Sequence, residues 1–163
     1  MKALFVVALS VIAAPVHAEA VSGPATVADG DTLDVGGRKI RLFGIDAPEL
    51  KQTCDLSGQS WACGEESARQ LSELVGSQDV HCAGNEVDTY GRLLAVCTGP
   101  YGELNKLMVE HGWATAFRQY SQNYIAGELR ARSGKQGLWA ASHEARRHRP
   151  WWNGNAHSCD RHR

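Results

Sequence analysis

The segment of residues 32–49 constrains the fold of this chain more than any other part of the sequence. Thr32 to Val35 has strand composition, Gly36-Gly37 is a two-residue hairpin signal, and Arg38 to Ile45 alternates apolar and polar side chains. A period of two belongs to a β-strand with one buried face. The segment therefore predicts a hairpin whose second strand runs into an acidic turn.

The end of that second strand gathers residues of chemical interest. Arg41 and Ile45 are predicted to share one face, because they are four positions apart in a strand. Asp46 follows at once, and Pro48 pins the approach of the chain to Glu49. Side chains that can bind a metal ion, accept a proton and bind an anion are therefore expected together at one strand end.

The rest of the chain predicts an α+β fold around a small barrel, because five short strands are interrupted and followed by helices. Residues 54–64 read as a loop, 113–116 as a short extended piece and 137–139 as a segment that docks on the domain. The strands are expected at 21–28, 32–35, 38–45, 79–85 and 92–98. The helices are expected at 65–75, at Leu104, Leu107, Met108 and His111, and at 121–132 with Ile125 and Leu129 as the apolar stripe.

The N-terminus has the pattern of a secretory signal peptide. Lys2 precedes an apolar run, Ala3 to Ala14, and Val16-His17-Ala18 fits a cleavage site after Ala18. A membrane anchor is the alternative, but the run is short for a bilayer span. We expect residues 1–18 to be removed and the protein to be periplasmic or secreted, with no membrane anchor.

Charge is nearly balanced but unevenly placed. Residues 19–127 hold eight Lys and Arg against fifteen Asp and Glu, whereas residues 128–163 hold eight against three. A nucleic-acid binder is usually basic, so non-specific affinity should be modest unless the basic end contributes. Residues 141–163 read as a basic tail containing Trp and His, appended to a single domain at 19–140.

Five cysteines lie in the exported part, where they can oxidise. We favour a Cys54–Cys63 bridge that closes a short loop, and a Cys82–Cys97 bridge that flanks a hairpin centred near residue 88. Cys159 is then free or intermolecular, because five is odd. Free buried thiols remain the alternative, and the absence of a Cys-x-x-Cys spacing argues against zinc.

Carboxylates from neighbouring strand ends suggest a site for a hard cation. Asp29, Asp31 and Asp46 supply the oxygens that calcium or magnesium prefers. The spacing is not that of an EF-hand. The alternative is a plain turn in which an aspartate caps its own backbone.

The two arginines suggest phosphate chemistry. Arg41 lies in an otherwise apolar strand and must meet an anion, either a nearby aspartate or a phosphate. Arg92, after Tyr90-Gly91, can act in the same way. Glu49 can orient or deprotonate water near a cation, although a solvated surface glutamate is the ordinary alternative. Together they predict cation-assisted attack at phosphorus.

Four motifs in this order resemble the staphylococcal nuclease (thermonuclease) family. They are Asp29-Gly-Asp-Thr32, Arg41-Leu-Phe-Gly-Ile-Asp-Ala-Pro-Glu49, Asp88-Thr-Tyr-Gly-Arg-Leu93 and Gly137-Leu-Trp139, and the resemblance spans residues 21–139. It implies an OB-fold five-stranded β-barrel with three α-helices. It also implies calcium-dependent hydrolysis of DNA and RNA that leaves 3′-phosphate ends.

The resemblance also implies a role for each matching residue. Asp31 and Asp46 correspond to calcium ligands, and Ala47 to a ligand through its backbone carbonyl. Arg41 and Arg92 correspond to phosphate clamps, Glu49 to the general base, and Tyr90 to a nucleotide contact. The chain departs from the well-known staphylococcal enzyme in being slightly acidic and in containing cysteine.

Other readings stay open beside this one. The tail can add phosphate contacts and base stacking, or pack on the domain through Trp151 and Trp152. Its histidines could bind a transition metal. The rival functions are a non-catalytic OB-fold module that binds nucleic acid, and a disulfide-linked interaction protein using Cys159. We expect a monomer that acts on DNA and RNA.

Overall fold

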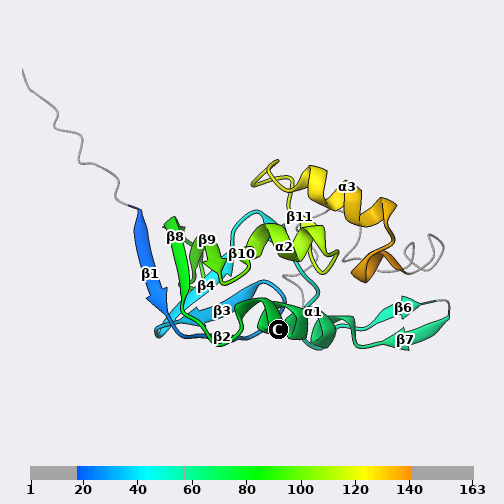
Figure 1. Cartoon of the computed structure of the whole chain (residues 1–163), viewed down its shortest axis with the longest axis horizontal. Coiled ribbons are helices and arrows are strands. Elements are labelled where there is room, and N and C mark those ends of the chain that lie inside the picture. The colour runs from blue at the N-terminus through cyan, green and yellow to red at the C-terminus, as the bar shows by residue number, and fades with distance from the viewer. Residues whose placement is uncertain (1–17, 57, 141–163) are drawn as a thin grey trace, which may run out of the picture.

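The computed structural model describes residues 18–56 and 58–140 (Figure 1). Most of the predicted signal peptide and the whole predicted tail, with Cys159 and the tail histidines, lie outside the described residues. Within the described part the fold is α+β, as predicted, with a curled sheet and three α-helices.

The main sheet is a barrel-like sheet whose two ends are contiguous in the chain. Its order is β1-β8-β9-β4-β3-β2, with β10 paired to β9, and only Pro24 separates β1 from β2. Proline cannot donate to a strand ladder, so the predicted single strand 21–28 bends and changes partner from β8 to β3. Counted as one bent strand, it gives the five strands of an OB-fold. The bounds are β1 Glu19–Gly23, β2 Ala25–Val27, β3 Thr32–Val35, β4 Arg38–Leu42, β8 Val80–Val87, β9 Leu93–Gly99 and β10 Gly102–Glu103.

The hairpin of β3 and β4 forms as predicted, but the second strand ends sooner. Gly44 has φ +77°, and the chain restarts as β5, Ile45–Asp46, which pairs with β11, Thr115–Ala116. Ile45 therefore joins the buried core, and the prediction that it shares a face with the half-buried Arg41 is wrong. A Cβ at Gly44 would lie 2.7 Å from the Cβ of Ser121, so this break needs glycine.

The described residues form three α-helices, the first two packed against the main sheet and the third packed on the second. They are α1 Cys63–Val75, α2 Leu104–Glu110 and α3 Ile125–Ser133, followed by a 3₁₀ turn η1, Gly137–Ala140, that buries Trp139 as predicted. The predicted stripe on α3 is correct for Ile125, which packs against the core, and wrong for Leu129, which is 54% exposed; the helix buries Gly127, Glu128 and Ala131. His111 is likewise exposed, after the end of α2.

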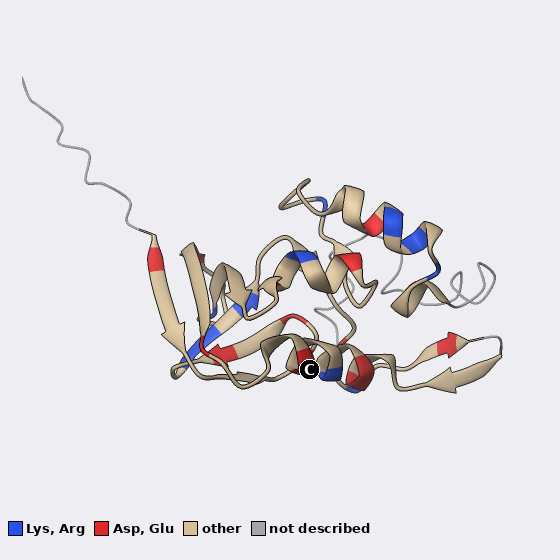
Figure 2. Cartoon of the chain, viewed as in Figure 1, with Lys and Arg blue, Asp and Glu red and all other residues tan. Residues whose placement is uncertain are grey.

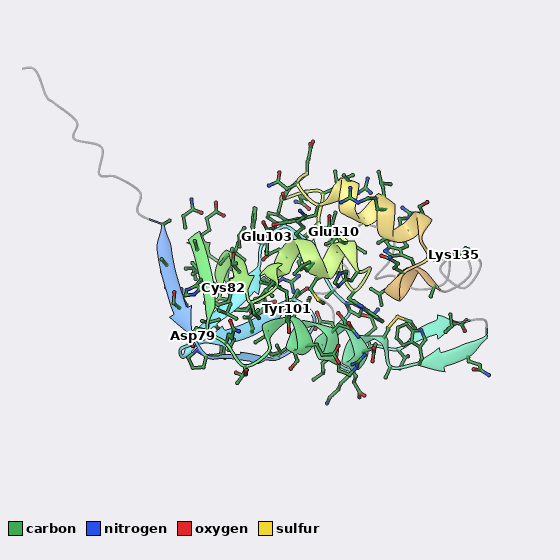
Figure 3. All side chains as sticks on the ribbon, in the orientation of Figure 1. Asp79, Cys82, Tyr101, Glu103, Glu110 and Lys135 are labelled. Carbon is green, nitrogen blue, oxygen red and sulfur yellow. A yellow bond between two sulfur atoms is a disulfide. The ribbon has the colours of Figure 1, made fainter. Side chains whose placement is uncertain are left out.

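α3 packs on α2 through polar contacts at both ends of α2. The Tyr124 hydroxyl donates to Glu103 Oε1 at 2.8 Å, and Arg130 pairs with Glu110; both glutamates are labelled in Figure 3. These polar contacts help to hold α3 in place, so the helix needs few buried apolar side chains. An apolar stripe is therefore a poor guide to which face of α3 is buried.

Residues 54–64 are not a loop but a hairpin followed by the start of α1. Strands β6, Cys54–Leu56, and β7, Gln59–Trp61, pair and project from the body of the domain (Figure 1). Gly58 at φ +85° makes the turn, and its N–H donates to Asp55 Oδ1 at 2.8 Å.

Both predicted disulfides are present. Cys82–Cys97 joins residues that face each other across β8 and β9, with Cα atoms 4.1 Å apart, and both are buried in the core. Cys54–Cys63 ties the base of the projecting hairpin to the first residue of α1. Among the described residues, no helix has the length and hydropathy needed to cross a bilayer.

Candidate active site

The two carboxyl groups of the acidic turn before β3, those of Asp29 and Asp31, lie in different environments. Asp29 Oδ1 accepts the N–H of Asp31 at 3.0 Å, so Asp29 caps its own turn. Asp31 is 1% exposed and turns inward, where the N–H of Ala47 donates to its Oδ2 at 2.8 Å. Asp29 thus follows the ordinary turn interpretation, whereas Asp31 is a buried acid between two strand ends.

Arg41 links the two carboxylates that were predicted to lie near it. Its Nη1 donates to Asp31 Oδ1, and its Nη2 donates to Asp46 Oδ1 at 2.9 Å. Asp31 lies before β3, Arg41 near the end of β4, and Asp46 in β5, so three elements meet here. The structure therefore brings together Asp31, Arg41, Asp46 and Ala47.

Arg92 reaches the same cluster from the β8–β9 turn. Asp88 Oδ2 accepts from Arg92 Nε at 2.8 Å, and its Oδ1 accepts the N–H groups of Tyr90 and Arg92, each at 2.9 Å. Arg92 Nη1 donates to Thr32 Oγ1 at 3.3 Å, and Thr32 Oγ1 donates to Asp31 at 3.1 Å. A continuous hydrogen-bonded chain thus joins the two arginines through Thr32.

Glu49 is exposed on the turn after β5, within electrostatic range of the cluster. Partial burial raises the pKa of Glu49, and the negative charges of Asp29 and Asp46 raise it further, while Arg41 and, less strongly, Arg92 oppose this. Both arginines therefore act on this carboxylate. A solvent-accessible acid whose proton affinity is increased is suited to accept a proton from water.

The cluster places two carboxyl groups, Asp31 and Asp46, beside one largely buried guanidinium group. Burial raises the pKa of Asp31 and of Asp46, and Arg41 offsets this only in part, because the neighbouring carboxylates repel one another. Their charges in turn raise the pKa of Arg41 despite its burial, so Arg41 stays cationic.

The donor set fits a hard cation. No group of three His, Cys, Asp or Glu side chains in residues 18–56 and 58–140 is gathered tightly enough to hold a metal on its own. The carboxyl groups of Asp31 and Asp46, which Arg41 links, form a smaller oxygen set of the kind that calcium or magnesium completes with water or phosphate oxygens. A bound cation would offset the cost of ionising Asp31 and Asp46, whose raised pKa values show that Arg41 alone does not offset it.

An exposed aromatic ring lies beside Arg92. Tyr90 is 70% exposed, and the Arg92 guanidinium lies 5.3 Å from its ring centroid. Basic residues are spread over β4, α1, α2 and α3 and interspersed with acids (Figure 2). The described part therefore shows a single guanidinium beside Tyr90 and no continuous basic track.

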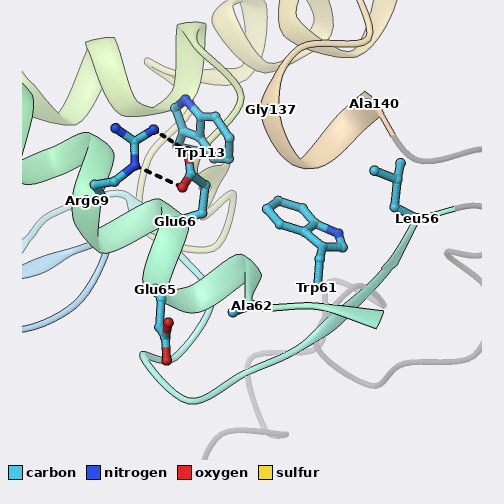
Figure 4. Close-up of a pocket in the computed structure, with 9 residues that line it drawn as sticks. All are labelled: Leu56, Trp61, Ala62, Glu65, Glu66, Arg69, Trp113, Gly137 and Ala140. Atoms are coloured by element: carbon cyan, nitrogen blue, oxygen red, sulfur yellow. Dashed lines mark hydrogen bonds and ion pairs between the residues drawn. The ribbon is translucent and has the colours of Figure 1, made fainter. Parts of the chain in front are cut away.

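A separate pocket of about 580 Å³ lies between the projecting hairpin, α1 and η1 (Figure 4). None of the predicted site residues lines it. Its walls are Leu56, Trp61, Ala62, Glu65, Glu66, Arg69, Trp113, Gly137 and Ala140. The predicted chemistry is therefore not located in this cavity but at the strand ends.

Four residues that support the cluster were not predicted from the sequence. Thr32 joins the arginines, and Asp88 holds Arg92. A Cβ at Gly30 would lie 2.7 Å from that of Ala47 and would overlap Ser67, whose hydroxyl donates to the Trp113 carbonyl at 2.8 Å. Gly30 thus lets α1 close over the acidic turn. The Asp-Gly-Asp-Thr and Asp-Thr-Tyr-Gly-Arg motifs contained the signal for the first three of these residues, but not for Ser67.

Comparisons with known proteins find a matching family model and several similar sequences. A family model described as staphylococcal nuclease homologue matches residues 39–141. The chain is 31% identical over 157 residues to the micrococcal nuclease of Shigella flexneri, covering 86% of this chain and 85% of that protein. It is 35% identical over 144 residues to an uncharacterized endonuclease of Escherichia coli O157:H7, covering 84% and 86%. It is 34% identical over 131 residues to the succinoglycan biosynthesis protein ExoI of Rhizobium meliloti (strain 1021), covering 78% and 69%.

Proposed function

Because this chain belongs to the staphylococcal nuclease family, and is accordingly a hydrolytic nuclease with an OB-fold, we propose that it is a calcium-dependent phosphodiesterase. It would act on DNA and RNA and leave 3′-phosphate ends. The observation that carries the proposal is the hydrogen-bonded chain from Arg92 through Thr32 and Asp31 to Arg41 and Asp46, with Glu49 beside it.

Asp31, Asp46 and the backbone carbonyl of Ala47 would hold the calcium ion. When bound, the ion supplies positive charge that stabilises the negative charge developing on the phosphoryl oxygens. This role fits the donor set, because hard oxygen ligands occur at this strand end and their raised pKa values show that Arg41 alone does not offset the cost of ionising them.

Side chains of the protein would activate the water and bind the phosphate. Glu49 orients water and accepts its proton, and the attack is in line with the leaving oxygen. Arg41 and Arg92 donate to the equatorial phosphoryl oxygens, where charge accumulates in the transition state. Both guanidinium groups are held by aspartates before substrate arrives, so little reorganisation is needed.

Substrate contacts and location follow from the same arrangement. Tyr90 is exposed beside Arg92 and would contact a nucleotide. The two disulfides are compatible with an oxidising compartment, and we propose export to the periplasm or outside the cell after cleavage at Ala18. Residues 19–140 would form the nuclease domain of a monomer, and residues 141–163 an appended basic tail.

The decisive test uses protein purified from residue 19. Degradation of single-stranded DNA is followed with calcium, with magnesium alone and with chelator, and the product ends are identified. Cleavage that requires calcium and leaves 3′-phosphates is expected. A folded protein that binds the strand but never cuts it would instead support the non-catalytic binding module.

A further inference from the structure

Residues 49–52 form a tight turn that is hydrogen-bonded to the start of α1. The Gln52 N–H donates to the Glu49 carbonyl at 2.8 Å, and the Glu49 N–H donates to Gln52 Oε1 at 3.3 Å. The Gln52 carbonyl in turn accepts the N–H of Gly64 at 3.1 Å. The backbone that carries the proposed base is therefore bound, through Gln52, to the first turn of α1.

The first turn of α1 also packs directly on Glu49. A Cβ at Gly64 would overlap the Glu49 carbonyl oxygen and lie 2.7 Å from that of Leu50. Because no side chain fits between them, any displacement of the first turn of α1 relative to residues 49–52 moves the backbone of Glu49.

The Cys54–Cys63 disulfide holds that first turn in place. Cys63 is the first residue of α1 and is fully buried, and Ala62 before it provides no side-chain cap. Its partner Cys54 faces Trp61 across the β6–β7 hairpin, and Trp61 packs edge-to-face on Trp113 at 6.3 Å between ring centroids (Figure 4). The bridge thus connects the turn of Glu49, the start of α1 and the anchored hairpin.

The second disulfide, Cys82–Cys97, is not connected to the segment that carries Glu49. Cys82 and Cys97 face each other within the β8–β9 ladder, whose strands are already hydrogen-bonded on both sides of the bridge. Its loss removes a cross-link from the core but leaves the contacts of Glu49 unchanged. It therefore provides a matched control.

We propose that the Cys54–Cys63 disulfide positions Glu49 for catalysis, so that the nuclease becomes active when these two thiols are oxidised. This rests on the proposed function. The two thiols lose two protons and two electrons as the S–S bond forms, and a disulfide oxidant such as oxidised glutathione takes them up and becomes two thiols. The reduced chain would be weakly active until it reaches an oxidising compartment.

The test compares two double variants, Cys54→Ser/Cys63→Ser and Cys82→Ser/Cys97→Ser, each in a Cys159→Ser background that prevents thiol exchange. The kcat and KM on single-stranded DNA with calcium and the Tm are measured for each. We expect the first pair to lower kcat by about tenfold or more with KM within about twofold, because a small misplacement of a catalytic group has a large effect. The second pair should lower Tm and leave kcat within about twofold of the background.

Measuring kcat as a function of redox potential distinguishes a positioning role from a merely structural one. In the Cys82→Ser/Cys97→Ser protein, kcat should fall on reduction and recover with oxidised glutathione, while the Cys54→Ser/Cys63→Ser protein should not respond. The proposal is overturned if Cys54→Ser/Cys63→Ser keeps its kcat, or if both pairs lower kcat equally.

Failure of the proposed function is recognised separately. If the oxidised Cys159→Ser protein does not cleave nucleic acid at all, hydrogen exchange of the amides of residues 49–52 decides the positioning role. Faster exchange in Cys54→Ser/Cys63→Ser than in Cys82→Ser/Cys97→Ser supports the role, and equal exchange overturns it.

Discussion

Arg41 and Arg92 are cationic side chains held by aspartates at neighbouring strand ends, and their identity as arginine matters more than their charge alone. Arg92 contacts Asp88 and Thr32 with different nitrogens of one planar group. A lysine is a compact point charge and cannot reproduce this fork. Substrate phosphate would meet the same geometry, so the arrangement is specific to guanidinium.

Arg92→Lys should lower kcat by about 10²-fold while the protein stays folded, since one fixed donor to a transition-state oxyanion typically contributes that much. Steady-state kinetics on single-stranded DNA and a thermal melt check this. Arg69→Lys is the matched control, because Arg69 is an exposed arginine that pairs with Glu66 and Glu73 on its own helix. Equal kcat for the two lysine variants would remove Arg92 from the proposed mechanism.

Glu49→Gln should lower kcat by about 10²–10⁴-fold, because the amide keeps the shape of the side chain but accepts no proton. Glu65→Gln on the exposed face of α1 is the control and should be neutral. Near-normal turnover of the Glu49→Gln protein would show that another group activates water.

The lowered pKa of the Asp88 carboxyl leads us to expect that its contribution to folding stability depends on pH. Burial acts to raise the pKa of Asp88, but the hydrogen bonds and charge of Arg92 outweigh it, and the pKa lies below its ordinary value of 3.8. A lowered folded-state pKa stabilises the fold above pH 3.8 and loses this contribution as the pH falls through the folded-state value. Asp88→Asn should therefore lower Tm at pH 7 and have a smaller effect near pH 3. Tm differences of equal size at both pH values would contradict this.

α2 is the element that connects the end of β4 with β9, through one buried amide. The Asn105 side chain accepts from the Cys97 N–H at 3.0 Å and donates to the Phe43 and Ala95 carbonyls at 3.0 and 3.1 Å. Phe43 immediately precedes the break at Gly44 that releases β5. The helix thus fixes where the strand carrying Arg41 stops.

Asn105→Ala should destabilise the protein by about 2–4 kcal/mol, because buried backbone groups lose their partner. Denaturant unfolding measures this. Asn123→Ala is the control, since Asn123 is exposed and its change should stay within about 0.5 kcal/mol. A similar loss in both variants would mean that the Asn105 network contributes little.

At the scale of the whole molecule, two cross-links reinforce a domain of modest size. Cys82–Cys97 closes a loop with a sequence separation of 15 in the centre of the sheet. Chain entropy gives a bridge of this length about 3 kcal/mol. Cys82→Ala/Cys97→Ala should therefore lower the free energy of unfolding by about that amount in chemical denaturation. An unchanged denaturation midpoint and m-value would show that the variant compensates for the lost bridge by repacking.

Much of the fold followed from local patterns. The Thr32–Val35 strand, the Gly36-Gly37 turn, the end of α1 at Gly76 and the pairing of all four bridged cysteines were predicted correctly. These features depend on period, turn chemistry and closeness along the chain, which a sequence displays directly. The motif residues at 31, 41 and 46 were likewise predicted to lie together and do so.

Other features depended on contacts between distant segments. The sequence by itself determined the strand pattern, the turn glycines and the carboxylate and guanidinium groups at the strand ends. Only the tertiary structure decided that Gly44 turns Ile45 into the core, that Leu129 faces solvent, and that Gly64 lies against Glu49. The reason is physical: a residue's burial and partners are set by what packs against it from elsewhere in the chain, and local periodicity contains no record of that.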